Sequence, residues 1–316
     1  MNLLSRLLGR RKSERVEWLT PPNPQLPKLP LREGEEAARN ASTEERNSAL
    51  SRLLLERDAL RQQLKHATAK VEFTPGRDLV VVLAFCAADE HRMRELLRWI
   101  AELGQVQATA LAVVPKSYTG WARMIPELVT AFDRHFTVKT PFDLPKEGWP
   151  LGPNWSFLTA AEHCRRTQSD FLWLEPDCIP LRSGWFEAIR DAYRAAGKPY
   201  LGFIEPGTND YPRHLTGNAV YHHGVFHHFR TDQLGRAWDI AMADTLLPLA
   251  AATPLIHQEF GPLDRPPVFH TVDDLRRIPQ EAALFHRNKD GSLIRVLRER
   301  RERDEQKETE GPEELS

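Results

Sequence analysis

The chain has 316 residues, of which 44 are acidic and 43 basic, giving a formal net charge of −1. Such a balance provides no global basic field for nucleic acid, although it is compatible with a local basic patch. The cysteines Cys86, Cys164 and Cys178 form no CxxC pair, so we expect neither a disulfide framework nor a zinc site, and a reducing cytoplasm fits best. No apolar run approaches the roughly 20 residues of a membrane span.

The first 72 residues are predicted to be an extension of a globular domain. Five prolines between Pro21 and Pro30 indicate a flexible segment over residues 1–41. The sequence from Ser42 to Glu45 is typical of a helix start, and neither Gly nor Pro follows before Pro75, so we expect a long helix over 42–72. Its leucine stripe suits either a two-stranded coiled coil, and thus a homodimer, or packing against the following domain.

Apolar runs alternate with segments of helical periodicity between residues 73 and 295. The run Leu79–Phe85 is continuous, as expected for a parallel strand that is covered on both faces. The alternation predicts an α/β domain with a Rossmann-like mixed sheet and helices on both faces. The charged tail 296–316 is expected to be a solvated helix that frays into disorder. Strands are expected at 79–85, 108–114, 135–139, 171–174, 200–204 and 253–258, and helices at 88–104, 121–132, 154–166, 185–196 and 237–249.

Two carboxylates, Glu175 and Asp177, follow the apolar run Phe171–Leu174. Residues i and i+2 of an extended chain point to the same side, and ligands of such sheets bind beyond the carboxyl ends of the strands. Paired carboxylates there suit Mg²⁺ or Mn²⁺ carrying a nucleotide diphosphate. The alternative is a surface turn in which Asp177 caps the next helix.

Four segments together resemble glycosyltransferases of the GT-A fold. They are the run ending at Phe85, the motif Leu174–Asp177, the loop Leu215–Ala219 and the segment Phe285–Arg287. The resemblance covers roughly residues 78–290. It implies a GT-A-like catalytic domain that moves a sugar from a nucleotide-diphosphate sugar to a hydroxyl acceptor.

The resemblance also implies where the metal and the donor bind. Glu175 and Asp177 match the family's DxD motif, with Asp177 the better direct ligand because Glu in the first position departs from the pattern. His286 resembles a third metal ligand, and imidazole suits Mn²⁺ better than Mg²⁺; the alternative is a histidine satisfied under a surface loop. The expected donor-binding residues are Phe85, Ala87, Asp89, Glu175, Arg287 and Lys289.

A second group of residues is expected on the acceptor side. By resemblance, His214, Gly217 and Asn218 belong to the acceptor loop, although Gly and Asn are equally typical of an ordinary turn. Asp239 is the first candidate for the catalytic base and Asp244 the second. Asp239 could instead simply stabilise a helix N-terminus. We expect the doublets His222-His223 and His227-His228 to form a histidine-rich loop near the acceptor rather than a zinc site.

The sequence alone does not identify the acceptor of the sugar. Segments 174–180 and 284–292 are similar to phage-type enzymes, some of which glycosylate hydroxymethylated pyrimidines in DNA, which would place the reaction in a host cytoplasm. DNA phosphates would then meet the helix 295–303 together with Lys65 and Lys70. A protein or polysaccharide acceptor is the alternative. A nucleotidyltransferase is less favoured because no Gly-rich phosphate loop follows Phe85, and a non-catalytic scaffold with a degenerate transferase domain stays open.

Overall fold

A computed structural model describes residues 73–141, 150–207, 212–228, 235–259 and 266–310 of the chain. The Pro-rich segment 1–41, the helix expected over 42–72 and the dimer that it would form lie outside the described residues. Every described helix is too short or too polar to cross a bilayer.

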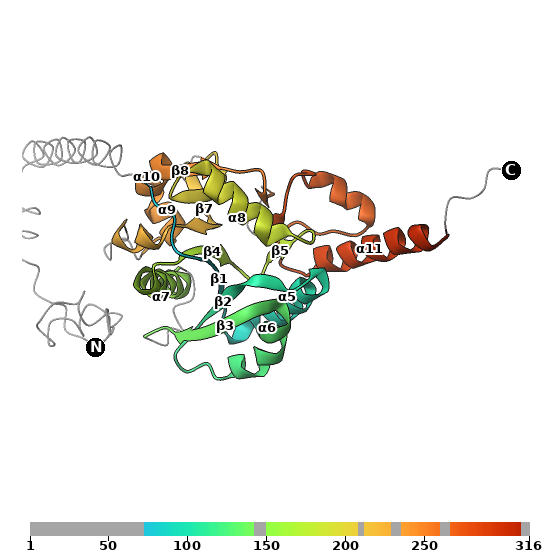
Figure 1. Ribbon diagram of the computed structural model, residues 1–316, viewed down its shortest axis with the longest axis horizontal. Helices are drawn as coiled ribbons and strands as arrows, with labels where there is room; N and C mark the ends of the chain where they lie inside the picture. Colours follow the sequence, from blue (N-terminus) through green and yellow to red (C-terminus); the bar gives the residue numbers. More distant parts are fainter. Residues whose placement is uncertain (1–72, 142–149, 208–211, 229–234, 260–265, 311–316) are drawn as a thin grey trace, which may run out of the picture. The chain divides into compact units, whose positions relative to one another are not determined.

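The main sheet has seven strands in the order β3-β2-β1-β4-β7-β6-β8 (Figure 1). Strands β3, β2, β1 and β4 run parallel, whereas β7 is antiparallel to both β4 and β6. The predicted mixed sheet is therefore confirmed. Its strands are β1 (Leu79–Ala84), β2 (Val106–Val114), β3 (Phe132–Lys139), β4 (Asp170–Leu174), β6 (Tyr200–Glu205), β7 (His214–Tyr221) and β8 (Ala250–Ala252).

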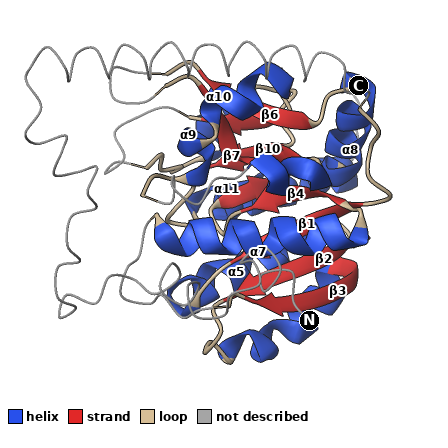
Figure 2. Cartoon of the chain, turned by 90° about the vertical axis from the view of Figure 1, so that its left-hand side faces the viewer, coloured by secondary structure: helices blue, strands red, loops and turns tan. Residues whose placement is uncertain are grey.

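Helices cover both faces of this sheet, as predicted. On one face, α5, α8 and α11 contribute buried residues to the hydrophobic core, and α7 lies across the other face (Figure 2). The ring of Phe157 in α7 packs against Phe171, Trp173 and Tyr221 of β4 and β7. The longer helices are α5 (Glu90–Leu103), α6 (Ile125–Ala131), α7 (Leu151–Thr167), α8 (Trp185–Ala196) and α11 (Ser292–Glu310). Shorter elements are α9 (Trp238–Ala241), α10 (Ala243–Leu246), η1 (Ala87–Asp89), η2 (Gly120–Met124), η3 (His223–His228), η5 (Leu247–Leu249) and η6 (Val272–Arg277).

A second sheet of three short strands was not foreseen. Its order is β5-β10-β9, with β5 (Cys178–Pro180), β10 (Leu284–His286) and β9 (Ile256–Gln258). The central strand β10 is antiparallel to β5 and parallel to β9. This sheet is what brings residue 286 back to the segment that follows β4.

The C-terminal third differs from the sequence prediction in three places. The helix expected over 237–249 is divided at Met242 into α9 and α10, followed by η5. The strand expected over 253–258 is limited to β9, while β8 precedes it. The predicted domain boundary at residue 295 falls inside α11, because Val296 and Leu297 are buried in the core and continue the helix across it.

Candidate active site

Glu175, Asp177 and His286 converge at the edge of the main sheet where β4 ends. Glu175 directly follows β4, Asp177 precedes β5, and His286 is the last residue of β10. The Nε2 atom of His286 lies 3.2 Å from Oε2 of Glu175 and 3.5 Å from Oδ1 of Asp177. One potential ligand atom from each side chain lies within 4.8 Å of the other two. The structure thus brings together the three residues that the sequence predicted to hold a metal ion.

Backbone hydrogen bonds fix the loop that carries the two acids. The N–H of Cys178 donates to the carbonyl oxygen of Glu175 over 3.0 Å, which closes a turn between β4 and β5. From the other side, the N–H of Asn288 donates to the carbonyl oxygen of Asp177 over 3.1 Å. The next helix, α8, has Gly184 at its N-cap. The alternative in which Asp177 caps that helix is therefore wrong.

The three side chains stabilise one another's charges. Burial lowers the pKa of His286, but the charges of Asp177 and Glu175 and their hydrogen bonds outweigh it and raise that pKa to about 10. Burial raises the pKa of Asp177, yet the nearby charges of His286 and Lys289 bring it below its ordinary value. An imidazolium held between two carboxylates identifies a position that favours positive charge.

This set of donors fits a divalent metal ion. Carboxylate oxygens are ligands for Mg²⁺ and Mn²⁺, and the imidazole favours Mn²⁺. Nδ1 of His286 lies 2.7 Å from Oε1 of Gln258, which leaves Nε2 facing Glu175 and Asp177. Metal-bound histidines commonly have their second nitrogen hydrogen-bonded in this way. Gln258 is a site residue that the sequence did not reveal, since only the pairing of β9 with β10 places it beside His286.

Gly217 lies between the acid pair and Asp239. A Cβ atom at position 217 would come 3.7 Å from Oε1 of Glu175 and 3.6 Å from Oδ2 of Asp239. Because glycine has no side chain, no Cβ stands between these two carboxylates. Burial raises the pKa of Asp239, and the charge of Glu175 acts in the same direction, while His214 opposes both. The arrangement suits a carboxylate that accepts a proton.

The short helix α9, which carries Asp239, is held against α7. Trp238 stacks on Phe157 with ring centroids 3.8 Å apart and an interplanar angle of 13°. The N–H of Trp238 donates to Oδ1 of the buried Asn154 over 2.9 Å. Asp244, the second candidate for the base, is exposed in α10. Of the two candidates, Asp239 is the one that reaches Gly217 and Glu175.

His214 and Asn218 are buried, with 5% and 1% of their surface exposed. Nδ1 of His214 lies 2.8 Å from the carbonyl oxygen of Pro212. Oδ1 of Asn218 accepts the backbone N–H of Glu175 over 3.0 Å. This contact holds the acid loop in place, and the sugar contact that the sequence suggested for Asn218 stays a prediction.

The residues expected to bind the donor occupy different environments. Phe85 is buried, with its ring edge-on to Tyr118, whereas Ala87 is exposed. Oδ2 of Asp89 accepts the backbone N–H of Cys86 over 3.3 Å, so this carboxylate caps its own loop. In the segment after β1, Ala87 and Ala88 are exposed and Asp89 is half-buried.

Arg287 and Lys289 follow the metal-ligand candidate on β10. Arg287 has a φ of 84°, in the left-handed region that non-glycine residues rarely adopt. Its guanidinium donates to the carbonyl oxygen of Glu259 over 3.2 Å, and the residue is 7% exposed. Lys289 is exposed, and its charge acts on Asp177. Strained backbone of this kind is concentrated at functional sites.

The His222-His223 doublet lies at the opposite end of β4 from Glu175, away from the candidate site. Oδ1 of Asp170, the first residue of β4, lies 2.9 Å from Nδ1 of His223 and accepts the backbone N–H of the same residue. The three side chains are close enough to share a metal ion. However, Nδ1 of His222 accepts the N–H of Gly224 over 3.1 Å, and Nε2 lies 3.2 Å from the carbonyl oxygen of Thr74, so both ring nitrogens are engaged within the chain. This group therefore forms a hydrogen-bonded anchor.

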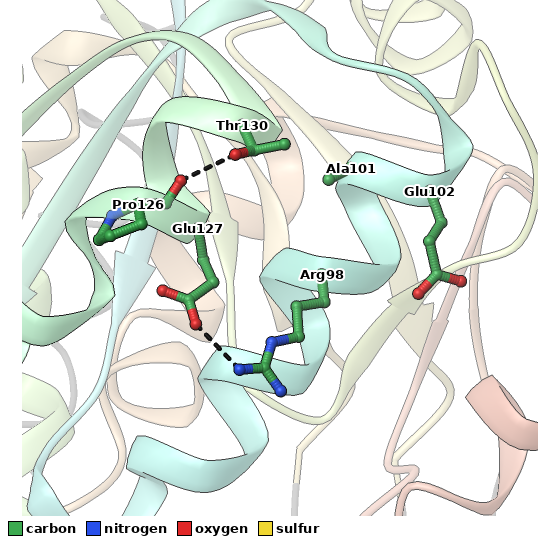
Figure 3. Close-up of a pocket in the computed structure, with 6 residues that line it drawn as sticks. All are labelled: Arg98, Ala101, Glu102, Pro126, Glu127 and Thr130. Carbon is green, nitrogen blue, oxygen red and sulfur yellow. Dashed lines mark hydrogen bonds and ion pairs between the residues drawn. The ribbon is translucent and has the colours of Figure 1, made fainter.

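A surface pocket of about 370 Å³ lies between α5 and α6 (Figure 3). Glu127 accepts a hydrogen bond from Arg98 across it over 3.2 Å. None of its lining residues belongs to the group around Glu175, so we assign it no part in the site. The lining residues are Arg98, Ala101, Glu102, Pro126, Glu127 and Thr130.

No protein-family model matches this chain, and no curated protein sequence matches it. Solved structures to which it is similar include mouse xyloside xylosyltransferase 1, with a TM-score of 0.45, 10% identity, and coverage of 67% of this chain and 98% of that protein. For the galactosyltransferase LgtC the TM-score is 0.42 and the identity 10%, with coverage of 67% and 88%. For GlyE of Streptococcus pneumoniae TIGR4 the values are 0.46 and 10%, with coverage of 72% and 60%. All three are glycosyltransferases, the class that the sequence resembles; at this level of similarity they carry no information on substrates.

Proposed function

We propose that this protein is a metal-dependent glycosyltransferase that moves a sugar from a nucleotide-diphosphate sugar to a hydroxyl acceptor. The observation that carries the proposal is the convergence of Glu175, Asp177 and His286 at the end of β4. The acid pair and the histidine come from two segments distant in sequence, and together they would form a site for a divalent cation. The GT-A resemblance of the same segments agrees with this chemistry.

Glu175, Asp177 and His286 would hold Mn²⁺ or Mg²⁺, which when bound would neutralise charge on the leaving diphosphate. Lys289 adds an exposed positive charge next to the same point, and Arg287 lies two residues before it. Ala87 and Asp89, which follow β1, would meet the nucleoside. The donor would thus lie across the carboxyl ends of β1 and β4, as ligands do in open α/β sheets.

Asp239 is the proposed general base. It would accept the proton of the acceptor hydroxyl while that oxygen attacks the anomeric carbon of the donor sugar. Without a side chain at Gly217, the reacting sugar would approach between Asp239 and Glu175. The raised pKa of Asp239 makes its carboxylate a stronger proton acceptor than an exposed aspartate.

A protein or polysaccharide hydroxyl is favoured over hydroxymethylated DNA as the acceptor. In the described part of α11, Arg295 bonds to Glu299, Arg298 to Glu102, and Arg301 to Glu305. These are three of the five arginines that the sequence offered as phosphate contacts, and they are engaged within the chain, whereas Arg300 and Arg303 are exposed. Lys65 and Lys70, the other candidates, lie outside the described residues.

The test is a donor screen on the purified full chain. A nucleotide-diphosphate sugar with Mn²⁺ should raise the melting temperature, and the same mixture should show slow metal-dependent hydrolysis of the sugar nucleotide without an acceptor. Hydrolysis would exclude the non-catalytic scaffold, and release of a nucleoside diphosphate rather than of a sugar 1-phosphate would exclude a nucleotidyltransferase. The Asp177→Asn variant should fold normally and lose both responses. If that variant retained full activity, the metal site would lie elsewhere.

The acceptor is tested by competition between substrates. Duplex DNA carrying hydroxymethylated pyrimidines, a polysaccharide and a protein mixture are each supplied with the donor that the screen identifies. Sugar incorporation into polysaccharide or protein is the expected result. Incorporation into DNA, with binding that weakens steeply as salt increases, would restore DNA as the acceptor.

A further inference from the structure

We propose that Gln258 and Glu205 are positioning residues of the metal site and act through His286. The inference rests on the proposed function, because it concerns residues that lie behind one of the proposed ligands. Neither residue touches the point where the metal would be held. Their effect is to determine which nitrogen of His286 is available to it.

The two residues form a continuous line of hydrogen bonds to His286. Gln258 and His286 are direct partners in the parallel pairing of β9 with β10, and Oε1 of Gln258 lies 2.7 Å from Nδ1 of His286. On its other side, Nε2 of Gln258 donates to Oε2 of Glu205 over 3.3 Å. Glu205 is the last residue of β6. The line therefore runs from the main sheet, across the small sheet, to the acid pair.

The chemistry of these groups gives the line a single direction. An ionised carboxylate can only accept, so Glu205 turns the NH₂ group of Gln258 towards itself and leaves the amide oxygen for His286. An amide oxygen also only accepts, so Nδ1 of His286 must carry a proton. In the neutral ring the lone pair is then on Nε2, which faces Glu175 and Asp177.

Glu205 is well placed for this role because its own position is restrained. It is the direct partner of His214 in the pairing of β6 with β7, and its Oε2 lies 3.9 Å from Nε2 of that histidine. Its side chain is 17% exposed. A carboxylate that is fixed by two strands can hold the amide of Gln258 in one orientation, where a mobile surface acid could not.

Two single variants test the contributions of Gln258 and Glu205 separately. Gln258→Leu removes the acceptor from Nδ1 and should weaken Mn²⁺ binding at least tenfold, as is typical when a hydrogen-bond partner of a ligating histidine is lost. Glu205→Gln should have a smaller effect in the same direction. An amide at position 205 can donate as well as accept, so Gln258 is free to turn over and present its NH₂ group to His286.

The double variant E205Q/Q258E provides a rescue. The new carboxylate at position 258 can accept from Nδ1 of His286, and the new amide at position 205 can donate to that carboxylate. The direction of the line is preserved although both residues have changed. The double variant should therefore bind Mn²⁺ within about threefold of wild type, a non-additive result that loss of packing would not produce.

Mn²⁺ alone is titrated into the full chain by calorimetry, and the melting temperature is measured in EDTA. The exposed residues Gln107 and Glu281 supply the controls Gln107→Leu and Glu281→Gln, which should bind Mn²⁺ as wild type does. In the Mg²⁺-loaded protein, ¹⁵N spectra of labelled histidine should show the proton of His286 on Nδ1.

The outcomes distinguish this inference from the proposed function. If wild type binds Mn²⁺ and Gln258→Leu binds it equally well, the positioning role is overturned while the metal site stands. If wild type binds no Mn²⁺, and Asp177→Asn behaves identically, both are overturned. If Gln258→Leu does not fold, Glu205→Gln is compared with the double variant instead. Equal weakening of Mn²⁺ binding in these two variants would overturn the positioning role.

Discussion

The carboxylates of Glu175 and Asp239 approach the same point above Gly217, with Oε1 of one 3.7 Å and Oδ2 of the other 3.6 Å from the position that a Cβ would take there. Continuing the register of β4 and β7 places Gly217 opposite Glu175. One acid belongs to the proposed metal site and the other is the proposed base. The space between them is where a sugar would react, and its size depends on the absence of one side chain.

Gly217→Ala should reduce activity far more than stability. The added methyl group would be 3.3 Å from Trp238 and in ordinary contact with the two carboxylates, so the fold can accommodate it with a small shift. We expect the melting temperature to change by only a few degrees and kcat/KM for sugar transfer to fall at least tenfold, because the methyl group occupies the reaction space.

Gly152→Ala is the matched control for this change. A Cβ at position 152, in α7, would meet nothing within 4 Å. Alanine in a helix is favoured over glycine by roughly 0.5–1 kcal/mol, so this variant should be slightly stabilised and fully active. Full activity in Gly217→Ala would show that the reacting sugar does not pass over this residue.

Asp239→Asn should lower kcat by roughly 100- to 10,000-fold, the usual contribution of a positioned general base. The variant should retain Mn²⁺ binding, because Asp239 is not among the three ligand candidates. The measurement is single-turnover transfer with Mn²⁺ affinity determined in parallel. Asp244→Asn, an exposed position on the neighbouring helix, should leave both values unchanged. Equal losses of kcat in Asp239→Asn and Asp244→Asn would overturn the assignment of Asp239 as the general base.

The affinity for Mn²⁺ should increase with pH. The pKa of His286 in the metal-free protein is raised from its ordinary value to about 10, so throughout the neutral range the ring holds a proton that a metal ion must displace. Release of one proton per ion makes Kd fall about tenfold for each unit of pH. Calorimetry at pH 6, 7 and 8 in buffers of different ionisation enthalpy measures both the affinity and the proton count.

His286→Gln provides the control for this pH dependence. The variant should bind Mn²⁺ more weakly, and its affinity should change less between pH 6 and 8 than that of wild type, because the titrating imidazole is gone. A wild-type affinity that is independent of pH would mean that the imidazole does not exchange its proton for the metal.

The sequence was sufficient for the elements that local patterns specify. The run Leu79–Phe85 predicted a strand covered on both faces, and β1 is indeed buried there. The acid pair was found because its spacing and its place after a strand are visible in the chain. The meeting of Asp177 with His286 was predicted only through the family resemblance, since it depends on the pairing of β5 with β10, each three residues long.

The residues that the sequence missed are defined by long-range pairing. Gln258 and Glu205 have no motif around them, and they acquire a role only because β9 pairs with β10 and the small sheet meets the end of β6. Asn218 was assigned to the acceptor from its neighbour Gly217, although successive side chains of a strand point to opposite faces. Its amide oxygen accepts the backbone N–H of Glu175, a contact that the sequence did not reveal.

Asp170 supports a last prediction, at the end of β4 remote from the acid pair. Its carboxylate is 1% exposed and accepts hydrogen bonds from the N–H of Gly76, the hydroxyl of Tyr193 and the N–H of His223. Asparagine has the same shape but only one oxygen, so Asp170→Asn would set an NH₂ group against donors. Loss of charge-assisted bonds worth roughly 1.5–3 kcal/mol each should lower the free energy of unfolding by about 3 kcal/mol.

Urea unfolding measures the effect, and Asp191→Asn, whose side chain is 66% exposed, is the control that should change stability very little. Mn²⁺ affinity should be the same in both variants, because the substitution lies four residues before the end of β4 and on the side away from Glu175. A loss of Mn²⁺ binding in a folded Asp170→Asn protein would show that the histidine group holds metal, contrary to the hydrogen-bond pattern of His222. An unchanged free energy of unfolding would show that the hydrogen bonds of Asp170 to Gly76, Tyr193 and His223 do not stabilise the fold.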